Sequence, residues 1–294
     1  MDAELLLAHV LGLSRTGLLT LGEVPDEATA RFGALVAQRV DRVPLQHLTG
    51  RAPFRHLELA VGPGVFVPRP ETEQLVEWAL AQLAGVAEPV VVDLGSGSGA
   101  IALSIAHEHP GALVTAVERD PGAIEWTRHN AATRAAAGDT PVEVLSGDMT
   151  DPGLLRELDG TVDLVVSNPP YVPNGATVPR EVADHDPPLA LWGGPDGLDV
   201  IRGLLWTAAR LLRPGGGLGI EHADQQGGAL PALVRATGGW SDVEDHPDLA
   251  GRPRFTTAQR PAHARTTYPG DPAGRPGGTG TCRTTVDWRC WPDG

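Results

Sequence analysis

The chain has 294 residues, of which 41% are hydrophobic and 20% charged. This is the composition of a folded globular protein, and it excludes a wholly disordered or collagen-like chain in spite of 37 Gly and 27 Pro. The 37 acidic residues outnumber 23 basic ones, all of them Arg, and a net charge of -14 argues against duplex DNA or exposed RNA as the main partner.

Nothing in the sequence points to export or to a membrane. The first residues, MDAELLLAHVLGLSR, lack the basic start of a secretory signal, and no apolar run reaches the roughly 20 residues needed to cross a bilayer. Cys282 and Cys290 both lie near the C-terminus, so no disulfide or cysteine metal site is expected in the core. We therefore expect a cytoplasmic protein that binds no metal.

The N-terminal part predicts a small helical unit followed by a hairpin. Apolar residues at helical spacing predict helices over 3–13 and 26–40. The segment 51–68, RAPFRHLELAVGPGVFVP, then alternates apolar and polar residues around a Gly-Pro-Gly sequence at 62–64. This pattern predicts two short strands joined by a turn at 62–64.

From residue 70 onward, helix and strand patterns alternate. A helix is predicted from 70 to about 85, because Pro70 suits a first helical turn. Further strands are predicted over 89–94, 112–118, 142–145, 162–166 and 218–222, and helices over 100–107, 122–137, 198–212 and 230–237. This alternation predicts an α/β fold with a doubly wound parallel sheet. The segment 261–294 is rich in Gly and Pro without apolar periodicity, so we expect a disordered tail.

A glycine-rich loop follows the strand at 89–94. It consists of Gly95, Ser96, Gly97, Ser98 and Gly99. Glycines allow the backbone to turn sharply and to approach a ligand, and the amides at the start of the next helix offer hydrogen bonds. Glu118 ends the following strand, where a carboxylate can accept both hydroxyls of a ribose. The loop lacks the GxGxxG spacing and the chain has no Lys, so the sequence predicts a nucleoside with few phosphates.

The segment that follows the strand at 142–145 contains a pair of residues that suit an adenine ring. Asp148 can accept a hydrogen bond from an exocyclic amine, and Met149 can pack on the ring face. A turn Asp beside a core Met explains the same residues equally well. The pattern leaves both interpretations open.

The most specific motif is Asn168-Pro169-Pro170-Tyr171, directly after the strand at 162–166. The two prolines fix the chain direction and remove two amide donors, which leaves backbone carbonyls and the Asn168 side-chain oxygen as acceptors. Such a site favours a substrate NH2 group, with Tyr171 as a flat wall beside it. The motif therefore predicts chemistry on a planar amino group.

These segments together resemble a known enzyme class. DLGSGSGAIALSIA, AVERD, GDM and SNPPYVP are similar to class I S-adenosylmethionine-dependent methyltransferases that modify planar amino groups. Upstream, PLQHLTGRAPFRHLELAVGPGVFVPRPETEQLVE resembles the release-factor glutamine methyltransferases, the HemK/PrmC family. The sequence PETE at 70–73 favours this branch over the sister enzymes that methylate a ribosomal protein.

The resemblance covers roughly residues 1–260 and implies a domain organisation. It implies a helical substrate-docking domain at 1–50, a β-hairpin linker at 51–68 and a seven-stranded Rossmann-like methyltransferase domain at 69–260, ahead of the 261–294 tail. Family members have another helix before the segment that starts at Asp2, so the docking domain is expected to lack a first helix. We expect a monomer that acts on peptide chain release factors and contacts no nucleic acid directly.

The resemblance also implies a role for each cofactor residue. The loop from Gly95 to Gly99 would hold the methionine part of S-adenosylmethionine, and Glu118 would hold the ribose. Asp148 and Met149 would contact the adenine. The implied reaction is methyl transfer to the side-chain amide of the glutamine in the GGQ motif of release factors.

The substrate side is implied in the same way. Asn168, Pro169, Pro170 and Tyr171 would hold the glutamine amide, with Asn168 also next to the cofactor. Phe54 and Arg69 match family positions near the substrate entrance. Glu221 and His222 end a strand near the pocket, where they are expected to support the site rather than to act as a base.

Other functions remain open. An N6-adenine DNA or RNA methyltransferase shares the Asn-Pro-Pro-Tyr motif, but it should carry a basic surface, which this acidic chain does not predict. A ribosomal-protein glutamine methyltransferase is a second alternative. A non-catalytic protein that binds the cofactor is a third, although the intact glycine-rich loop and the Asn-Pro-Pro-Tyr motif argue against it.

Overall fold

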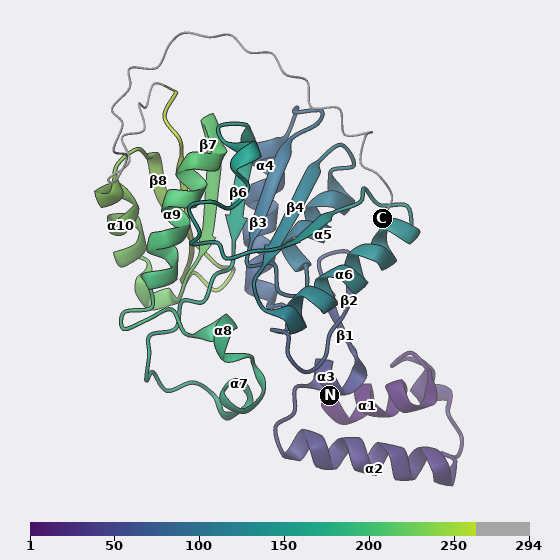
Figure 1. Ribbon diagram of the computed structural model, residues 1–294. Helices are drawn as coiled ribbons and strands as arrows, with labels where there is room; N and C mark the ends of the chain where they lie inside the picture. Colours follow the sequence, from purple (N-terminus) through teal and green to yellow (C-terminus); the bar gives the residue numbers. More distant parts are fainter. Residues whose placement is uncertain (263–294) are drawn as a thin grey trace. The chain divides into compact units, whose positions relative to one another are not determined.

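The computed structural model describes residues 1–262 and has an α/β fold around one seven-stranded sheet (Figure 1). The strand order is β5-β4-β3-β6-β7-β9-β8. The strands are β3 (Val90–Leu94), β4 (Leu113–Glu118), β5 (Glu143–Ser146), β6 (Val162–Ser167), β7 (Leu212–Glu221), β8 (Ser241–Pro247) and β9 (Pro253–Gln259). The first five of these run parallel, and β9 lies antiparallel between β7 and β8. The predicted doubly wound sheet is confirmed.

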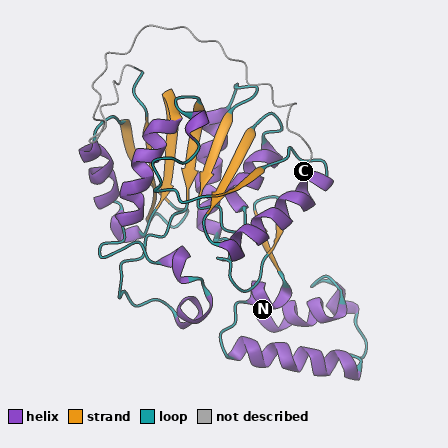
Figure 2. Ribbon diagram, viewed as in Figure 1, coloured by secondary structure: helices purple, strands orange, loops and turns teal. Residues whose placement is uncertain are grey.

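Helices cover both faces of the sheet, because its central strands are apolar on both sides (Figure 2). Along β3, Val91 packs on the face covered by α4 (Glu73–Leu83) and α5 (Ala100–Glu108). Val92 and Leu94 pack on the opposite face with α9 (Asp199–Leu211) and α10 (Ala229–Thr237). The helix α6 (Pro121–Ala136) contacts β4 and β5. Because the five strands run parallel, their carboxyl ends lie together at one edge of this packed sheet.

The N-terminal residues form the predicted helical unit. It contains α1 (Asp2–Leu11), the 3-10 turn η1 (Gly17–Thr20), α2 (Asp26–Val40) and the short α3 (Leu45–Thr49). Arg39 of α2 donates to Asp2 of α1 at 2.7 Å and to Glu181 at 2.5 Å. Glu181 belongs to α7 (Arg180–His185), which precedes α8 (Pro188–Leu191), so an ion pair connects the helical unit to the segment after β6.

The predicted hairpin exists, but the predicted position of its turn is wrong. Strands β1 (Arg51–Phe54) and β2 (Leu57–Ala60) pair antiparallel, so the turn lies at 55–56 rather than at 62–64. Arg55 takes a positive φ of 49° at this turn. Its backbone N–H donates to Glu73 at 3.0 Å and its guanidinium donates to Glu108 at 2.6 Å, and these bonds offset the strain. Gly62 instead allows close packing, since a Cβ there would lie 2.6 Å from the Trp126 ring.

Several elements have no clear signal in the sequence. The edge strand β8 is mostly exposed and charged, so it lacks the alternating apolar pattern by which strands are recognised. The helix predicted from 70 begins as the 3-10 turn η2 (Pro70–Thr72) before α4. Two further 3-10 turns, η3 (Arg156–Leu158) and η4 (Asp224–Gln226), follow β5 and β7.

The helix α4 lies close against β7. A Cβ on Gly219 of β7 would lie 2.6 Å from the Trp78 ring and 2.7 Å from a methyl group of Leu75, both on α4. A glycine at this position therefore allows the helix to approach the strand closely. The approach brings Thr72, which precedes α4, to Glu221 at the end of β7.

The predicted tail at 261–294 lies almost wholly outside the described residues. Within residues 1–262, no helix combines the length and the apolar character that crossing a membrane requires.

Candidate active site

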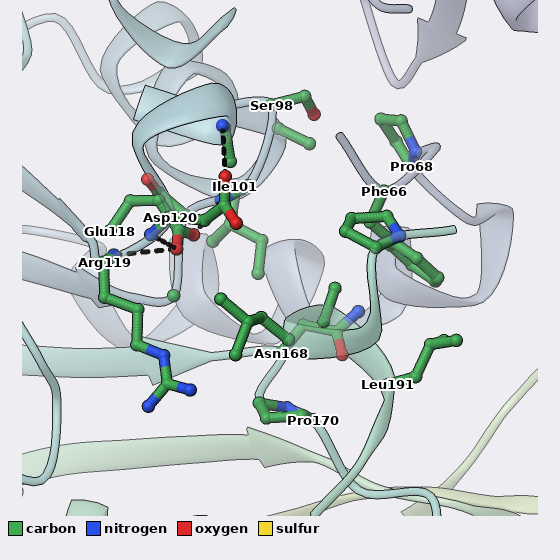
Figure 3. Close-up of a pocket in the computed structure, with 18 of the residues that line it drawn as sticks. Phe66, Pro68, Ser98, Ile101, Glu118, Arg119, Asp120, Asn168, Pro170 and Leu191 are labelled. Atoms are coloured by element: carbon green, nitrogen blue, oxygen red, sulfur yellow. Dashed lines mark hydrogen bonds between the residues drawn. The ribbon is translucent and has the colours of Figure 1, made fainter. Parts of the chain in front are cut away.

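A pocket opens where the parallel strands of the sheet end, and most of the candidate residues line it (Figure 3). The candidates that line it are Phe54, Arg69, Gly95, Ser96, Gly97, Ser98, Glu118, Asp148, Met149, Asn168, Pro170 and Tyr171. Two candidates lie elsewhere. Gly99 forms the N-cap of α5, and Pro169 is buried and does not line the pocket.

The glycine-rich loop requires glycine at Gly95. This residue has a φ of 81°, and a Cβ on it would lie 2.6 Å from the Cε atom of Met149. The N–H groups of Gly95 and Ser96 donate to the carbonyl of Val117 at 2.8 and 3.0 Å, which fixes the loop to β4. The backbone of the loop therefore passes close to Met149, and no side chain at its first position fills the space between them.

Glu118 is held by backbone donors. Its Oε1 accepts from the N–H groups of Arg119 and Asp120 at 2.7 and 2.9 Å, and its Oε2 accepts from the N–H of Gly97 at 2.9 Å (Figure 3). A carboxylate offers about four acceptor positions. Three of them are used here, and the fourth belongs to Oε2, at the pocket wall.

Asp148 and Met149 lie next to each other at the pocket. Asp148 accepts from the backbone N–H and the hydroxyl of Thr150 at 2.8 and 2.7 Å, and pairs with Arg119 at 3.1 Å. Partial burial acts to raise the pKa of Asp148, but the bonds from Thr150 and the Arg119 charge outweigh it and lower the pKa. Asp148 is therefore an acceptor, while the Met149 side chain supplies an apolar surface of which only 8% is exposed.

The Asn168 side chain is tied to two residues outside the Asn-Pro-Pro-Tyr motif. Its Nδ2 donates to the hydroxyl oxygen of Thr72 at 3.2 Å, and the Thr72 hydroxyl donates to Oε2 of Glu221 at 2.6 Å. The Tyr171 hydroxyl donates to Oε1 of the same carboxylate at 3.3 Å. Thr72 was not predicted from the sequence, although it lies in the PETE segment. Its side chain is 3% exposed, and nothing in the pattern around it indicates a polar contact.

Burial changes the ionisation of this group of side chains. It raises the pKa of Glu221 to about 7, although the bond from Thr72 and the charge of Arg254 act in the opposite direction. Burial and the neighbouring Glu221 also raise the pKa of Tyr171, which therefore stays protonated and remains a hydrogen-bond donor.

The other side of the pocket is apolar, with Phe66, Pro68 and Leu191 around its mouth (Figure 3). The guanidinium of Arg69 lies 4.7 Å from the centre of the Phe66 ring and pairs with Asp186 at 2.8 Å. The Asp186 side chain is almost fully buried, and this burial raises its pKa against the effect of Arg69. Arg69 is thus fixed at the entrance by a ring and a carboxylate.

The residues present fit an adenosine that carries an amino-acid chain. The open loop at Gly95, the remaining acceptor position of Glu118 and the surface of Met149 supply a backbone cradle, a hydroxyl acceptor and an apolar ring contact. Among residues 1–262, no group of three or more His, Cys, Asp or Glu side chains is arranged to hold a metal ion. These groups suit a nucleoside-type cofactor, and they lie beside an acceptor for an NH2 group.

Two family models match this chain. The PrmC N-terminal domain matches residues 1–50, and the methyltransferase small domain matches residues 58–184. Among solved structures, a methyltransferase from Pyrococcus furiosus has a TM-score of 0.51 at 20% identity, over 76% of this chain and 99% of that one. A T. thermophilus 16S rRNA methyltransferase in complex with AdoMet and guanosine also has a TM-score of 0.51, at 23% identity, over 71% of this chain and 49% of that one. These likenesses show the fold.

Curated relatives are much more similar. A release factor glutamine methyltransferase from Mycolicibacterium smegmatis is 53% identical over 263 residues, which is 90% of this chain and 91% of that protein. Another, from Streptomyces coelicolor, is 52% identical over 264 residues, or 88% and 90% of the two chains. The chain therefore belongs to the release factor glutamine methyltransferases, a family of S-adenosylmethionine-dependent enzymes.

Proposed function

We propose that the protein transfers a methyl group from S-adenosylmethionine to the side-chain amide nitrogen of the glutamine in the GGQ motif of peptide chain release factors. The observation that carries this proposal is the Asn168 side chain at the pocket wall. Its Nδ2 is engaged by Thr72, which leaves Oδ1 as an acceptor for a substrate NH2 group. The close relatives are named release factor glutamine methyltransferases, which agrees with this substrate.

The cofactor side of the proposal rests on the glycine-rich loop and Glu118. We assign the methionine part to Gly95 through Gly99 and the ribose to Glu118, of which one acceptor position remains after its three backbone bonds. Asp148 accepts from the adenine amine, and Met149 packs on the ring. When bound, S-adenosylmethionine supplies an electrophilic methyl group on a positively charged sulfur.

The Asn-Pro-Pro-Tyr motif orients the side-chain amide of the substrate glutamine. An amide nitrogen is a weak nucleophile because its lone pair is delocalised into the carbonyl group. Asn168 Oδ1 and a backbone carbonyl of the Asn-Pro-Pro-Tyr motif accept from the two N–H hydrogens and fix the direction of the lone pair. Tyr171 packs beside the planar group, and the apolar lining of the pocket, which includes Phe54, excludes water.

We further propose how the release factor is recognised. The helical unit at 1–50 docks it, the hairpin at 51–68 links that unit to the catalytic domain at 69–260, and Arg69 contacts it at the pocket entrance. The ion pair between Arg39 and Glu181 supports a fixed relation between the docking helices and the segment after β6. We also propose that the protein is a monomer that acts in the cytoplasm. Its net charge of -14 argues against direct contact with nucleic acid.

Transfer of a labelled methyl group tests the function. Purified protein is incubated with methyl-labelled S-adenosylmethionine and a release factor, either intact or with the GGQ glutamine changed to alanine. We expect label in the intact factor and none in the variant. A large-subunit ribosomal protein serves as the competing substrate. Label in that protein alone, or equal label in both release factors, contradicts the proposal.

A further inference from the structure

A line of three hydrogen-bonding groups leads from the end of β7 to the pocket. Glu221 accepts from the Thr72 hydroxyl at 2.6 Å, and the Thr72 oxygen accepts from Asn168 Nδ2 at 3.2 Å. Glu221 and Thr72 are only 1% and 3% exposed, so water does not compete for these bonds. We infer that Glu221 and Thr72 are positioning residues that fix which end of the Asn168 amide faces the substrate. This inference rests on the proposed function of the site.

The direction of each bond follows from the chemistry of the groups. An ionised carboxylate only accepts hydrogen bonds, so the single hydrogen of the Thr72 hydroxyl must point to Glu221. The Thr72 oxygen can then only accept from the side chain on its other side. An Asn side chain has one donor end and one acceptor end, so the donor Nδ2 faces Thr72 and Oδ1 is left for the pocket.

The orientation matters because the two ends of an amide have opposite effects on a substrate NH2. Oδ1 accepts from the NH2 group, whereas Nδ2 in its place would put two donors against each other. Such a reversed side chain would bind the glutamine amide poorly and would not support its lone pair. Glu221 therefore acts on the reaction through Thr72 and Asn168, without contact to the substrate.

Protonation of Glu221 removes this control. A neutral carboxyl group can donate its own hydrogen to the Thr72 oxygen, and the Thr72 hydroxyl is then free to donate to a reversed Asn168. The groups that face Glu221 are the hydroxyls of Thr72 and Tyr171 and the charges of Arg254 and Glu71. Of these, only Glu71 opposes ionisation by its charge, together with burial, which raises the pKa of Glu221 to about 7. Turnover is thus expected to rise as the pH increases through about 7.

A matched pair of substitutions at Thr72 tests the inference. Thr72→Val keeps the shape of the side chain but removes the hydroxyl, and Thr72→Ser keeps the hydroxyl. We expect Thr72→Val to lower kcat for release-factor methylation on the order of tenfold to hundredfold, the usual effect of losing a group that orients an active-site side chain. The dissociation constant for S-adenosylmethionine should change less than about twofold, and Thr72→Ser should retain most of the turnover.

A second measurement covers the case in which Thr72→Val does not fold. The pH profile of kcat is compared between the wild type and Glu221→Gln, from pH 6 to pH 8.5. The wild type should lose turnover below about pH 7, whereas Glu221→Gln, whose side chain does not titrate, should show no such step. A step that persists in Glu221→Gln, or equal kcat values for folded Thr72→Val and the wild type, overturns the inference alone. A wild type that methylates no release factor overturns the proposed function instead, and this inference with it.

Discussion

Replacing Glu118 by Gln tests the ribose site with a change of only one atom. In the native loop, Oε1 accepts from Arg119 and Asp120, and Oε2 accepts from Gly97. A Gln amide has one oxygen and one NH2 group, so the NH2 must face at least one backbone N–H. The less costly orientation keeps the two bonds at the Oε1 position and turns the NH2 toward Gly97. That orientation removes the one acceptor position left for a ribose hydroxyl.

The magnitude follows from the loss of one hydrogen bond to a charged acceptor, which contributes about 1.5 to 3 kcal/mol. This corresponds to a dissociation constant for S-adenosylmethionine raised by roughly tenfold to a hundredfold. Titration calorimetry of Glu118→Gln is compared with Glu125→Gln, which removes the same charge from an exposed position on α6, where the side chain is 78% exposed. Equal dissociation constants for the two variants would refute the assignment of Glu118.

Three further predictions concern the pocket and the core of the sheet. Asn168→Ala should bind S-adenosylmethionine within about threefold of the wild type yet lower kcat on the order of a hundredfold; equal losses in a binding titration and a turnover assay would count against it. Gly95→Ala should weaken cofactor binding, because its Cβ would lie 2.6 Å from Met149, and Gly95→Ala/Met149→Ala should recover part of the affinity in calorimetry. Burial raises the pKa of Asp93 to about 7, so the native state holds a proton that the unfolded chain releases above about pH 4. The free energy of unfolding, measured in urea, should therefore fall between about pH 4 and about pH 7 more steeply for the wild type than for Asp93→Asn, a change within β3.

The sequence predicts best those parts of the fold in which a local pattern and the tertiary structure agree. Buried strands such as β3 and β6 are mostly apolar, with one Asp in each, and each is followed by a loop with distinctive residues. The positions of these strands, and the pocket residues in the loops that follow them, were therefore predictable. The edge strand β8 is not apolar, and the turn at Arg55 is stabilised by residues from α4 and α5, which are distant in sequence.

The same limit applies to the site. Asn168 and Glu118 follow strands at positions where chemistry is commonly found, and the structure places both at the pocket. Thr72 is different, because its contacts to Asn168 and Glu221 join positions 96 and 149 residues apart. No local pattern encodes a contact between elements that meet only after folding, so the role of Thr72 could be recognised only in the structure.

The close packing of Gly219 against α4 makes a residue remote from the pocket relevant to turnover. Any side chain at Gly219 must push Trp78 or Leu75 outward, and Thr72 directly precedes α4 in the chain. A displacement of a few tenths of an ångström is small for a helix but large for the 2.6 Å bond between Thr72 and Glu221. Substitutions at Gly219 will therefore escape a search that ranks residues by distance from the ligand, although they act on the rate. An engineer who alters this enzyme should treat the spacing between α4 and β7 as part of its active site.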